Sequence, residues 1–252
     1  MNPIDSPATH SGGASRAGGD DAPGFFGKLP TLGDFVQRRL PRQFVEPWDR
    51  WLQEVLAESR AQLGDAWLDT YLVSPLWRFV LSPGIAGHNA WAGVMIPSVD
   101  RVGRYFPLTL ARSVPAQTDC FRLLCAHDWF GPLEDLALST LEDDFELPGF
   151  DAGLLQLPPP PVSLLAAADA DGGRPDAWQL DAADAVLPLA ASRLLRHALE
   201  DVFLSYSLWW CPGAEHVHAS LLTCQGLPAP QAYVSMLAGD WTAGGWTRLG
   251  SA

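Results

Sequence analysis

Three short apolar segments in the middle of the chain constrain its fold more than any other feature. They are WRFVLS (77–82), WAGVMI (91–96) and YFPLTLAR (105–112), and each is rich in aromatic or β-branched residues, as β-strands are. The links between them are short and contain turn-forming residues. Strands that follow one another through short links usually pair antiparallel. We therefore predict a three-stranded meander. Because its strands are almost wholly apolar, we expect both faces of the sheet to be covered.

Segments with helical and strand patterns flank this meander. Apolar residues recur with helical spacing over 47–63, 119–141 and 190–203 and in a short segment near 231–237. Pro47 suits the first turn of the first helix and Gly64 its end, and a break is expected at 131–132. Further strands are predicted at 24–29, 206–211 and 218–224. The expected fold class is α+β, a layered α/β/α domain around a largely antiparallel sheet.

The sequence predicts one folded domain with two low-complexity parts. Residues 1–23 are mostly Ser, Gly, Ala, Asp and Pro and have almost no large apolar side chain, so we expect a disordered tail. Residues 24–252 are expected to form a single domain. An insert rich in Pro, Ala and Asp is expected within it, near 157–177.

Charge and hydropathy argue against several classes of function. The formal net charge is −13, and the stretch from Glu134 to Asp184 has twelve acidic residues and one basic residue. The clustered lysine and arginine that bind nucleic acid or anionic membrane surfaces are missing. No window is apolar enough for a membrane helix, and the first residues do not resemble a secretory signal. We therefore expect a cytoplasmic protein that binds no nucleic acid and does not insert into a membrane.

Motifs for catalysis or metal binding are weak throughout the chain. The segment GFFGKL (24–29) lacks the first glycine and the final hydroxyl residue of a phosphate-binding loop. Lys28, the only lysine, is interpreted as an exposed residue at a strand end. His216 and His218 share one face of a predicted strand, but no third ligand follows at suitable spacing. No nucleophile elbow is present, and the four cysteines include no C-x-x-C pair. We predict no catalytic residue, metal or cofactor.

The turn PSVDRVGR (97–104) places Asp100, Arg101 and Arg104 between two apolar strands. We expect Asp100 to bond turn amides or an arginine, and Gly103 to adopt a positive φ. A buried arginine would need an acidic partner, and Asp34 in LPTLGDFV (29–36) is the candidate for contact with Arg104. A structural role for the turn is favoured, and a role in a partner surface stays open.

Adjacent tryptophans offer a second candidate for a partner surface. Trp209 and Trp210 lie in the predicted strand 206–211, and neighbouring residues of a strand face opposite sides of the sheet. One of the two could therefore lie outside the core. An exposed aromatic side chain there would be a natural anchor for a partner protein.

Five segments resemble, in the same order, the TagF/ImpM family of type VI secretion-associated proteins. They are GFFGKLPTLGDFVQRRLP (24–41), PWDRWL (47–52), SPLWRFVL (74–81), PSVDRVGRYFPLTL (97–110) and SLWWCPG (207–213). The patterns G-K-L-P-x-x-G-D-F and P-S-x-D-x-x-G-R-x-F-P are the most specific, and they contain Lys28, Asp34, Asp100 and Arg104. The tail and the insert contribute nothing to the resemblance.

The resemblance implies a regulator and not an enzyme. Members of this family look like cytoplasmic repressors that act after translation by contacting a forkhead-associated scaffold protein of the secretion apparatus, sometimes alongside threonine phosphorylation. The implied fold is a layered domain similar to longin-like domains. The candidate binding residues are Lys28, Asp34, Asp100, Arg101, Arg104, Trp209 and Trp210.

Two other functions remain open at this point. A hydrolase or small-ligand protein would use Asp34, Asp100, Arg101 and Arg104, and it requires these groups to converge in a concave site with shifted pKa values. A purely structural subunit of the secretion assembly is a further alternative.

Overall fold

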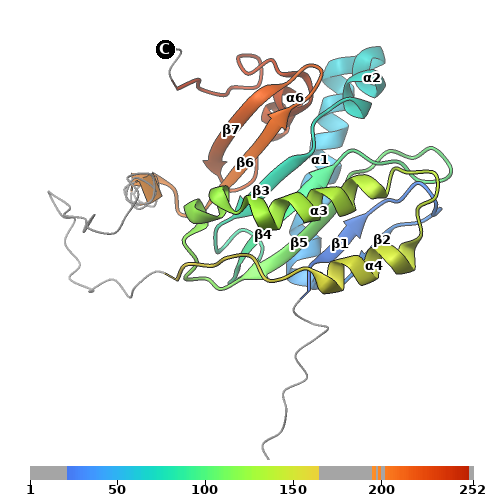
Figure 1. Ribbon diagram of the computed structural model, residues 1–252. Coiled ribbons are helices and arrows are strands. Elements are labelled where there is room, and N and C mark those ends of the chain that lie inside the picture. Colours follow the sequence, from blue (N-terminus) through green and yellow to red (C-terminus); the bar gives the residue numbers. More distant parts are fainter. Residues whose placement is uncertain (1–21, 165–194, 197, 200–201, 250–252) are drawn as a thin grey trace, which may run out of the picture.

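The described residues fold around one open sheet of seven antiparallel strands (Figure 1). In this computed structural model they comprise 22–164, 195, 196, 198, 199 and 202–249. In sheet order the strands are β2 (Val36–Arg38), β1 (Gly24–Gly27), β5 (Leu108–Val114), β4 (Ala90–Ile96), β3 (Trp77–Leu81), β6 (Tyr206–Gly213) and β7 (His218–Gln225). β4 pairs antiparallel with both β3 and β5, which confirms the predicted meander.

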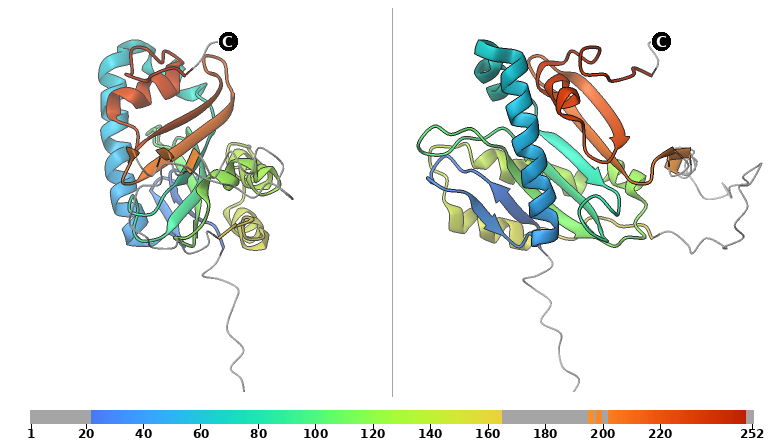
Figure 2. Two further views of the ribbon diagram at one scale, coloured as in Figure 1. Left: turned by 90° about the vertical axis from the view of Figure 1, so that its left-hand side faces the viewer. Right: turned by 180° about the vertical axis from the view of Figure 1, so that it is seen from behind.

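Helices cover both faces of the sheet, so the described residues form three layers (Figure 2). One face carries α1 (Arg42–Leu63), the short 3-10 helix η1 (Gly64–Ala66), α2 (Trp67–Leu72) and α6 (Pro230–Ala238). The other face carries the 3-10 helix η2 (Cys120–Cys125), α3 (His127–Ser139) and α4 (Leu147–Gln156). The predicted α+β class with α/β/α layers is confirmed, whereas the likeness to longin-like domains stays a prediction.

Alternating side chains of the central strands fill two separate cores. Phe79 of β3 packs with the helices α1, α2 and α6, and the next residue, Val80, belongs to the core beneath α3 and α4. β4 is buried along its whole length, as expected for a strand covered on both faces. Gly93 at its centre is needed for close approach, because a Cβ there would lie 2.2 Å from the carbonyl oxygen of Leu110.

Two prolines lie inside helices, at positions where the sequence predicted a helix start and a helix break. α1 begins at Arg42, so Pro47 is not in the first turn but within the helix. Its missing N–H leaves the carbonyl of Gln43 without a helical partner. α3 continues through Pro132, so the expected break at 131–132 was wrong. The buried residues Trp129 and Leu133 anchor this helix on both sides of the proline.

Several elements carried too weak a pattern to be predicted, namely β2, α2 and α4. The insert is described only over 157–164, where Leu164 forms a bridge with Thr118. The rest of the insert, most of the helix predicted over 190–203 and nearly all of the tail lie outside the described residues. The domain boundaries therefore stay a prediction. No helix in the described part of the chain is long and apolar enough to cross a membrane.

Candidate functional site

The charged segment between β4 and β5 is a tight turn closed by its own backbone. The amide of Gly103 donates to the carbonyl of Asp100 at 3.0 Å, and the amide of Asp100 donates to the carbonyl of Arg104 at 3.0 Å. Gly103 has a φ of 83°, a conformation that glycine adopts without strain. The positive φ expected at this glycine is therefore confirmed.

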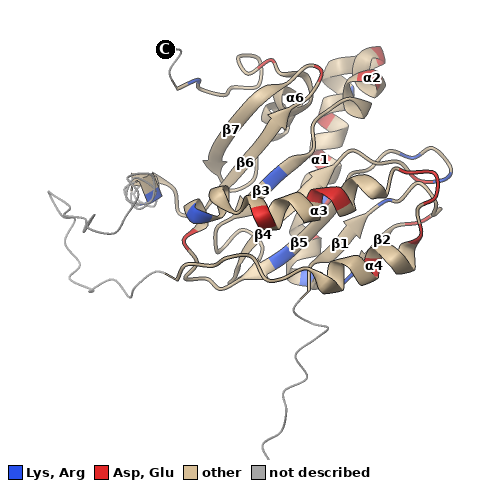
Figure 3. Ribbon diagram, viewed as in Figure 1, with Lys and Arg blue, Asp and Glu red and all other residues tan. Residues whose placement is uncertain are grey.

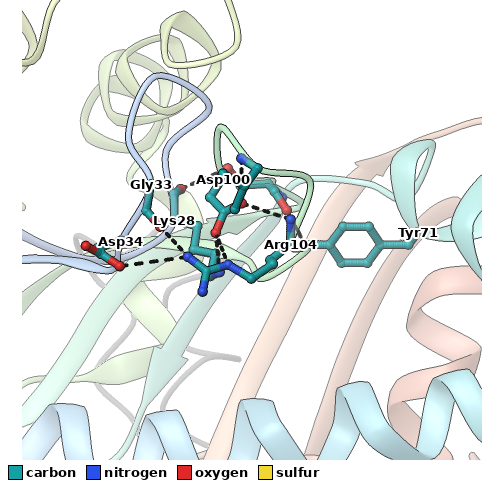
Figure 4. A network of polar contacts seen from close by, with 8 residues as sticks. Lys28, Gly33, Asp34, Tyr71, Asp100 and Arg104 are labelled. Atoms are coloured by element: carbon teal, nitrogen blue, oxygen red, sulfur yellow. Dashed lines mark hydrogen bonds and ion pairs between the residues drawn. The ribbon is translucent and has the colours of Figure 1, made fainter.

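Asp100 lies at the centre of the polar contacts of the turn (Figure 4). Its carboxylate is fully buried. One oxygen accepts from the backbone amides of Val102 and Arg104 at 3.0 and 2.9 Å. The other oxygen accepts from Lys28 Nζ at 2.5 Å and from Arg104 Nε at 2.6 Å. Burial by itself would raise the pKa of this carboxyl. The hydrogen bonds from Lys28, Arg104 and Val102 outweigh burial and hold the pKa well below its usual range.

Lys28 is the buried partner of this carboxylate and not an exposed strand-end residue, which corrects the sequence interpretation. The residue directly after β1 is only 4% exposed, and its ammonium lies 5.0 Å from the centre of the Phe35 ring. Its backbone carbonyl accepts a hydrogen bond from the Ser98 hydroxyl at 2.9 Å. A buried ammonium must be paired, and Asp100 supplies that pair across 72 residues of sequence.

A tyrosine from α2 fixes the start of the turn from the other side. The hydroxyl of Tyr71 donates to the carbonyl of Ser98 at 3.0 Å and accepts from the Ser98 amide at 2.9 Å. Burial raises the pKa of Tyr71 well above its usual value, so the hydroxyl keeps its proton and can serve both roles. The turn is thus held by β1, by α2 and by its own arginine.

The loop over residues 29–35 lies against the turn. The amide of Arg101 donates to the carbonyl of Leu32 at 2.9 Å, and the guanidinium of Arg104 donates to the carbonyl of Gly33. Asp34 is fully exposed, and its carboxylate lies 3.8 Å from Arg104 Nη2. The predicted contact of Asp34 with Arg104 therefore exists as a solvent-exposed ion pair, while Asp100 is the closer acidic partner of that arginine.

The outer side of this loop and turn exposes apolar and basic side chains together. We call residues 32–35 and 101–104 the loop-and-turn surface. Phe35 is 50% exposed and Val102 is 65% exposed, and Arg101 is also exposed. Phe35 packs edge-on against Phe106, with ring centres 4.7 Å apart. The sequence patterns did not identify Phe35 and Val102 as surface residues. An apolar residue between charged ones, as in Asp-Arg-Val-Gly-Arg, could have indicated an exposed apolar side chain.

The two tryptophans of β6 face opposite sides of the sheet, as predicted. Trp209 is fully buried, and its indole N–H donates to the Ser207 hydroxyl at 2.9 Å. Trp210 is partly buried against Phe130, with ring centres 4.8 Å apart. Trp209 is therefore a core residue and cannot belong to a partner surface without unfolding. Trp210 is the member of the pair that reaches the surface.

The charged groups of Asp100 and Arg104 in the turn pair with each other, and Asp100 also pairs with Lys28. A surface cavity of about 390 Å³ lies elsewhere, lined by Arg39, Gln43, Trp91 and Arg112 among others. The described residues contain no cluster of three or more His, Cys, Asp or Glu side chains with metal-binding geometry. His216 and His218 are both exposed at the β6–β7 hairpin. The arrangement at the turn is one of paired charges.

Comparison with known proteins agrees with this structure. The family model for the TagF N-terminal domain, which is type VI secretion system-associated, matches residues 24–157. The crystal structure of PA0076 from Pseudomonas aeruginosa PAO1 is similar, with 40% sequence identity and a TM-score of 0.78 over 92% of this chain and 99% of that chain. No curated protein sequence matches the chain. On these grounds the chain belongs to the TagF family of type VI secretion system-associated proteins.

Proposed function

We propose that this protein is a non-enzymatic cytoplasmic regulator that represses a type VI secretion system after translation, by binding a forkhead-associated scaffold protein of the apparatus. Membership of the TagF family supports a role connected with this secretion system. The contact with the scaffold protein and the repression are the steps that we propose.

The loop-and-turn surface is the observation that carries this proposal. The backbone of the turn is fixed by the buried Lys28–Asp100 pair, so its outer side chains project from a rigid support. Those side chains include Phe35, Arg101 and Val102, all of them exposed. Aromatic and arginine side chains are enriched in protein interfaces and dominate their binding energy. A rigid surface of this kind loses little conformational entropy when a partner binds.

The charge of the surface also indicates the kind of partner. Arg101 and Arg104 are exposed beside one exposed acidic residue, Asp34, so the outer side of this surface has a small excess of positive charge on a chain whose net charge is −13. A basic spot on an acidic protein orients an approaching acidic surface and disfavours other orientations. We therefore expect the complementary surface of the scaffold protein to be acidic and apolar.

The alternative of a hydrolase or small-ligand protein finds no support in the geometry. Asp100 is engaged by four hydrogen bonds, and its lowered pKa makes it a weak general base. Asp34 is fully exposed. None of Asp34, Asp100, Arg101 and Arg104 lines the cavity of about 390 Å³.

Binding to the purified scaffold protein tests the proposal. We expect Val102→Asp and Arg101→Glu to abolish binding and to release repression of secretion, because both residues are exposed on the proposed surface. Leu155→Asp is the matched control, since Leu155 in α4 is 43% exposed and lies outside that surface. Each variant is first checked by circular dichroism for unchanged unfolding. Wild-type affinity in both surface variants would refute the assignment of this surface, and a wild-type protein that does not bind the scaffold would refute the proposed partner.

A further inference from the structure

The two edges of the sheet differ in length and chemistry. β2 has three residues and includes Arg38, and short, charged edge strands resist pairing with other strands. β7 at the opposite edge has eight residues, HASLLTCQ, with no Lys, Arg, Asp, Glu or Pro (Figure 3). Among the described residues, the protective features of edge strands are therefore present at β2 and absent at β7.

The outer side of β7 is unpaired within the described part of the chain. β6 pairs with its inner side from Gly213↔His218 to Tyr206↔Gln225, and β7 is the last strand in the sheet order. In an antiparallel strand, alternate residues direct their N–H and C=O groups to the outer side. Among the described strands, none pairs with this outer row of N–H and C=O groups.

An exposed leucine lies in the middle of this edge. Leu221 is 58% exposed and lies opposite Trp210 in the β6–β7 register. Its neighbour Leu222 faces the other side of the sheet, where it packs against the core formed with α1 and α6. A large apolar side chain beside an unpaired strand is a typical feature of an interaction site.

We propose that two copies of this chain pair antiparallel through β7, with Leu221 of each copy at the two-fold axis. In this register Leu221 faces the same residue of the other copy on the same side of the sheet. Ser220 then faces Leu222 of the other copy, and His218 faces Cys224 of the other copy. The two sheets become one continuous sheet, and both exposed leucines leave water.

Three features favour a second copy over an unrelated strand. β7 is already extended and ordered by β6, so pairing two such strands avoids the ordering cost that a free peptide would meet. Over residues 206–237 the only formal charge is Glu215, so two copies can approach here despite their net charge of −13 each. Because β2 is short and charged, β7 is the one long, uncharged edge among the described strands of each copy. Once two copies pair through β7, no such edge is left for a third copy, so the assembly stops at a dimer.

The oligomeric state of the full chain tests this proposal. We expect light scattering with size-exclusion chromatography to give the mass of two chains, falling toward one chain on dilution. Leu221→Lys places two ammonium groups against each other at the two-fold axis and should give one chain at every concentration. Leu155→Lys changes a leucine of similar exposure in α4 and should leave the dimer intact. Circular dichroism verifies that both variants fold.

Cross-linking provides a second measurement that does not depend on the lysine variant. Residues directly opposite in an antiparallel pair have Cβ atoms about 4.5–5.5 Å apart, which is close enough for a disulfide after small adjustment. We expect Leu221→Cys, in a Cys125→Ser background that removes the exposed native thiol, to form a covalent dimer under mild oxidation. Leu155→Cys in the same background should remain uncross-linked.

Four outcomes would overturn the proposal. They are a monomeric wild type at all concentrations, open-ended aggregates instead of a closed dimer, a dimer that Leu221→Lys leaves intact, and cross-linking at position 155 equal to that at 221. A monomer that binds another secretion protein, and loses it on Leu221→Lys, would assign the edge to a strand of that protein and refute the pairing of two copies.

Discussion

Substitution by phenylalanine is expected to change the free energy of unfolding by different amounts at the two adjacent tryptophans of β6. Trp209→Phe affects a ring that is fully buried and packed against aromatic rings of α1 and β3 at centroid distances of 5.4–5.9 Å. It also removes the indole N–H that donates to Ser207. Trp210→Phe retains the edge-on contact with Phe130. It removes an indole N–H that is buried without an acceptor in the part of the chain that the structure describes.

The structure sets the size of each effect. Loss of a hydrogen bond lowers the free energy of unfolding by about 1 kcal/mol, and removing a whole buried tryptophan costs about 3–5 kcal/mol. Trp209→Phe should therefore cost about 2 kcal/mol. For Trp210→Phe, the smaller ring loses contact area, while deletion of an unsatisfied N–H returns about 1 kcal/mol. We expect the stability of this variant to lie within about 0.5 kcal/mol of the wild type.

Urea and thermal unfolding of both variants check this comparison. Far-ultraviolet circular dichroism is the suitable signal, because the chain has 11 tryptophans and their fluorescence would be mixed. For a chain of this size, 1 kcal/mol corresponds to about 2–4 °C in Tm, so Trp209→Phe should lower Tm by about 4–8 °C. Equal losses in the two variants, or a larger loss for Trp210→Phe, would refute the assignment of Trp209 to the core and of an unpaired N–H to Trp210.

Three further expectations follow from the turn and its supports. The lowered pKa of Asp100 means that its ionised form stabilises the fold above the unfolded-state pKa of about 3.9 and that this stabilisation is lost as pH falls toward the folded-state value. The urea midpoints of wild type and Lys28→Met should therefore differ most at neutral pH and approach each other below about pH 4. A difference that is constant with pH would contradict the pairing of Lys28 with Asp100. Gly27→Ala should lower the free energy of unfolding by about 2 kcal/mol or more. The reason is that Gly27 has a φ of 139° and that a Cβ there would lie 2.1 Å from the carbonyl oxygen of Pro107. An unchanged Tm would refute this expectation. Tyr71→Phe leaves a buried backbone amide unpaired and should cost about 1–3 kcal/mol in urea unfolding, and a neutral effect would show that the amide has another acceptor.

Local patterns in the sequence predicted most of the fold. The meander and the layering follow from strands that are apolar on both faces, such as β4, because only a sheet covered on two sides can bury them. β2 could not be predicted, since three residues with two exposed side chains show no periodicity. The start of α1 was placed too late because Pro47 resembles a first-turn proline, while Phe44 extends the buried face one turn earlier.

The candidate site was predicted in part, and the missing part is non-local. Asp100 as the centre of the turn follows from local turn chemistry. Lys28 was misjudged because its partner lies 72 residues away, a separation that single-sequence patterns do not reveal. Which of Trp209 and Trp210 would be buried depends on the face that β6 presents to α1. That choice is set by the register with β3, where Phe79 lies opposite Trp209.

The buried ion pair and the exposed surface above it have different relations to function. A buried pair such as Lys28–Asp100 contributes little net stability compared with apolar residues, yet removing one partner is costly, because the other charge is left in the interior. Substitutions of Lys28 or Asp100 will therefore reduce any activity of the protein through unfolding. Substitutions of Arg101 or Val102 change the surface and leave that pair intact. Only variants of the second kind can separate partner recognition from structural support.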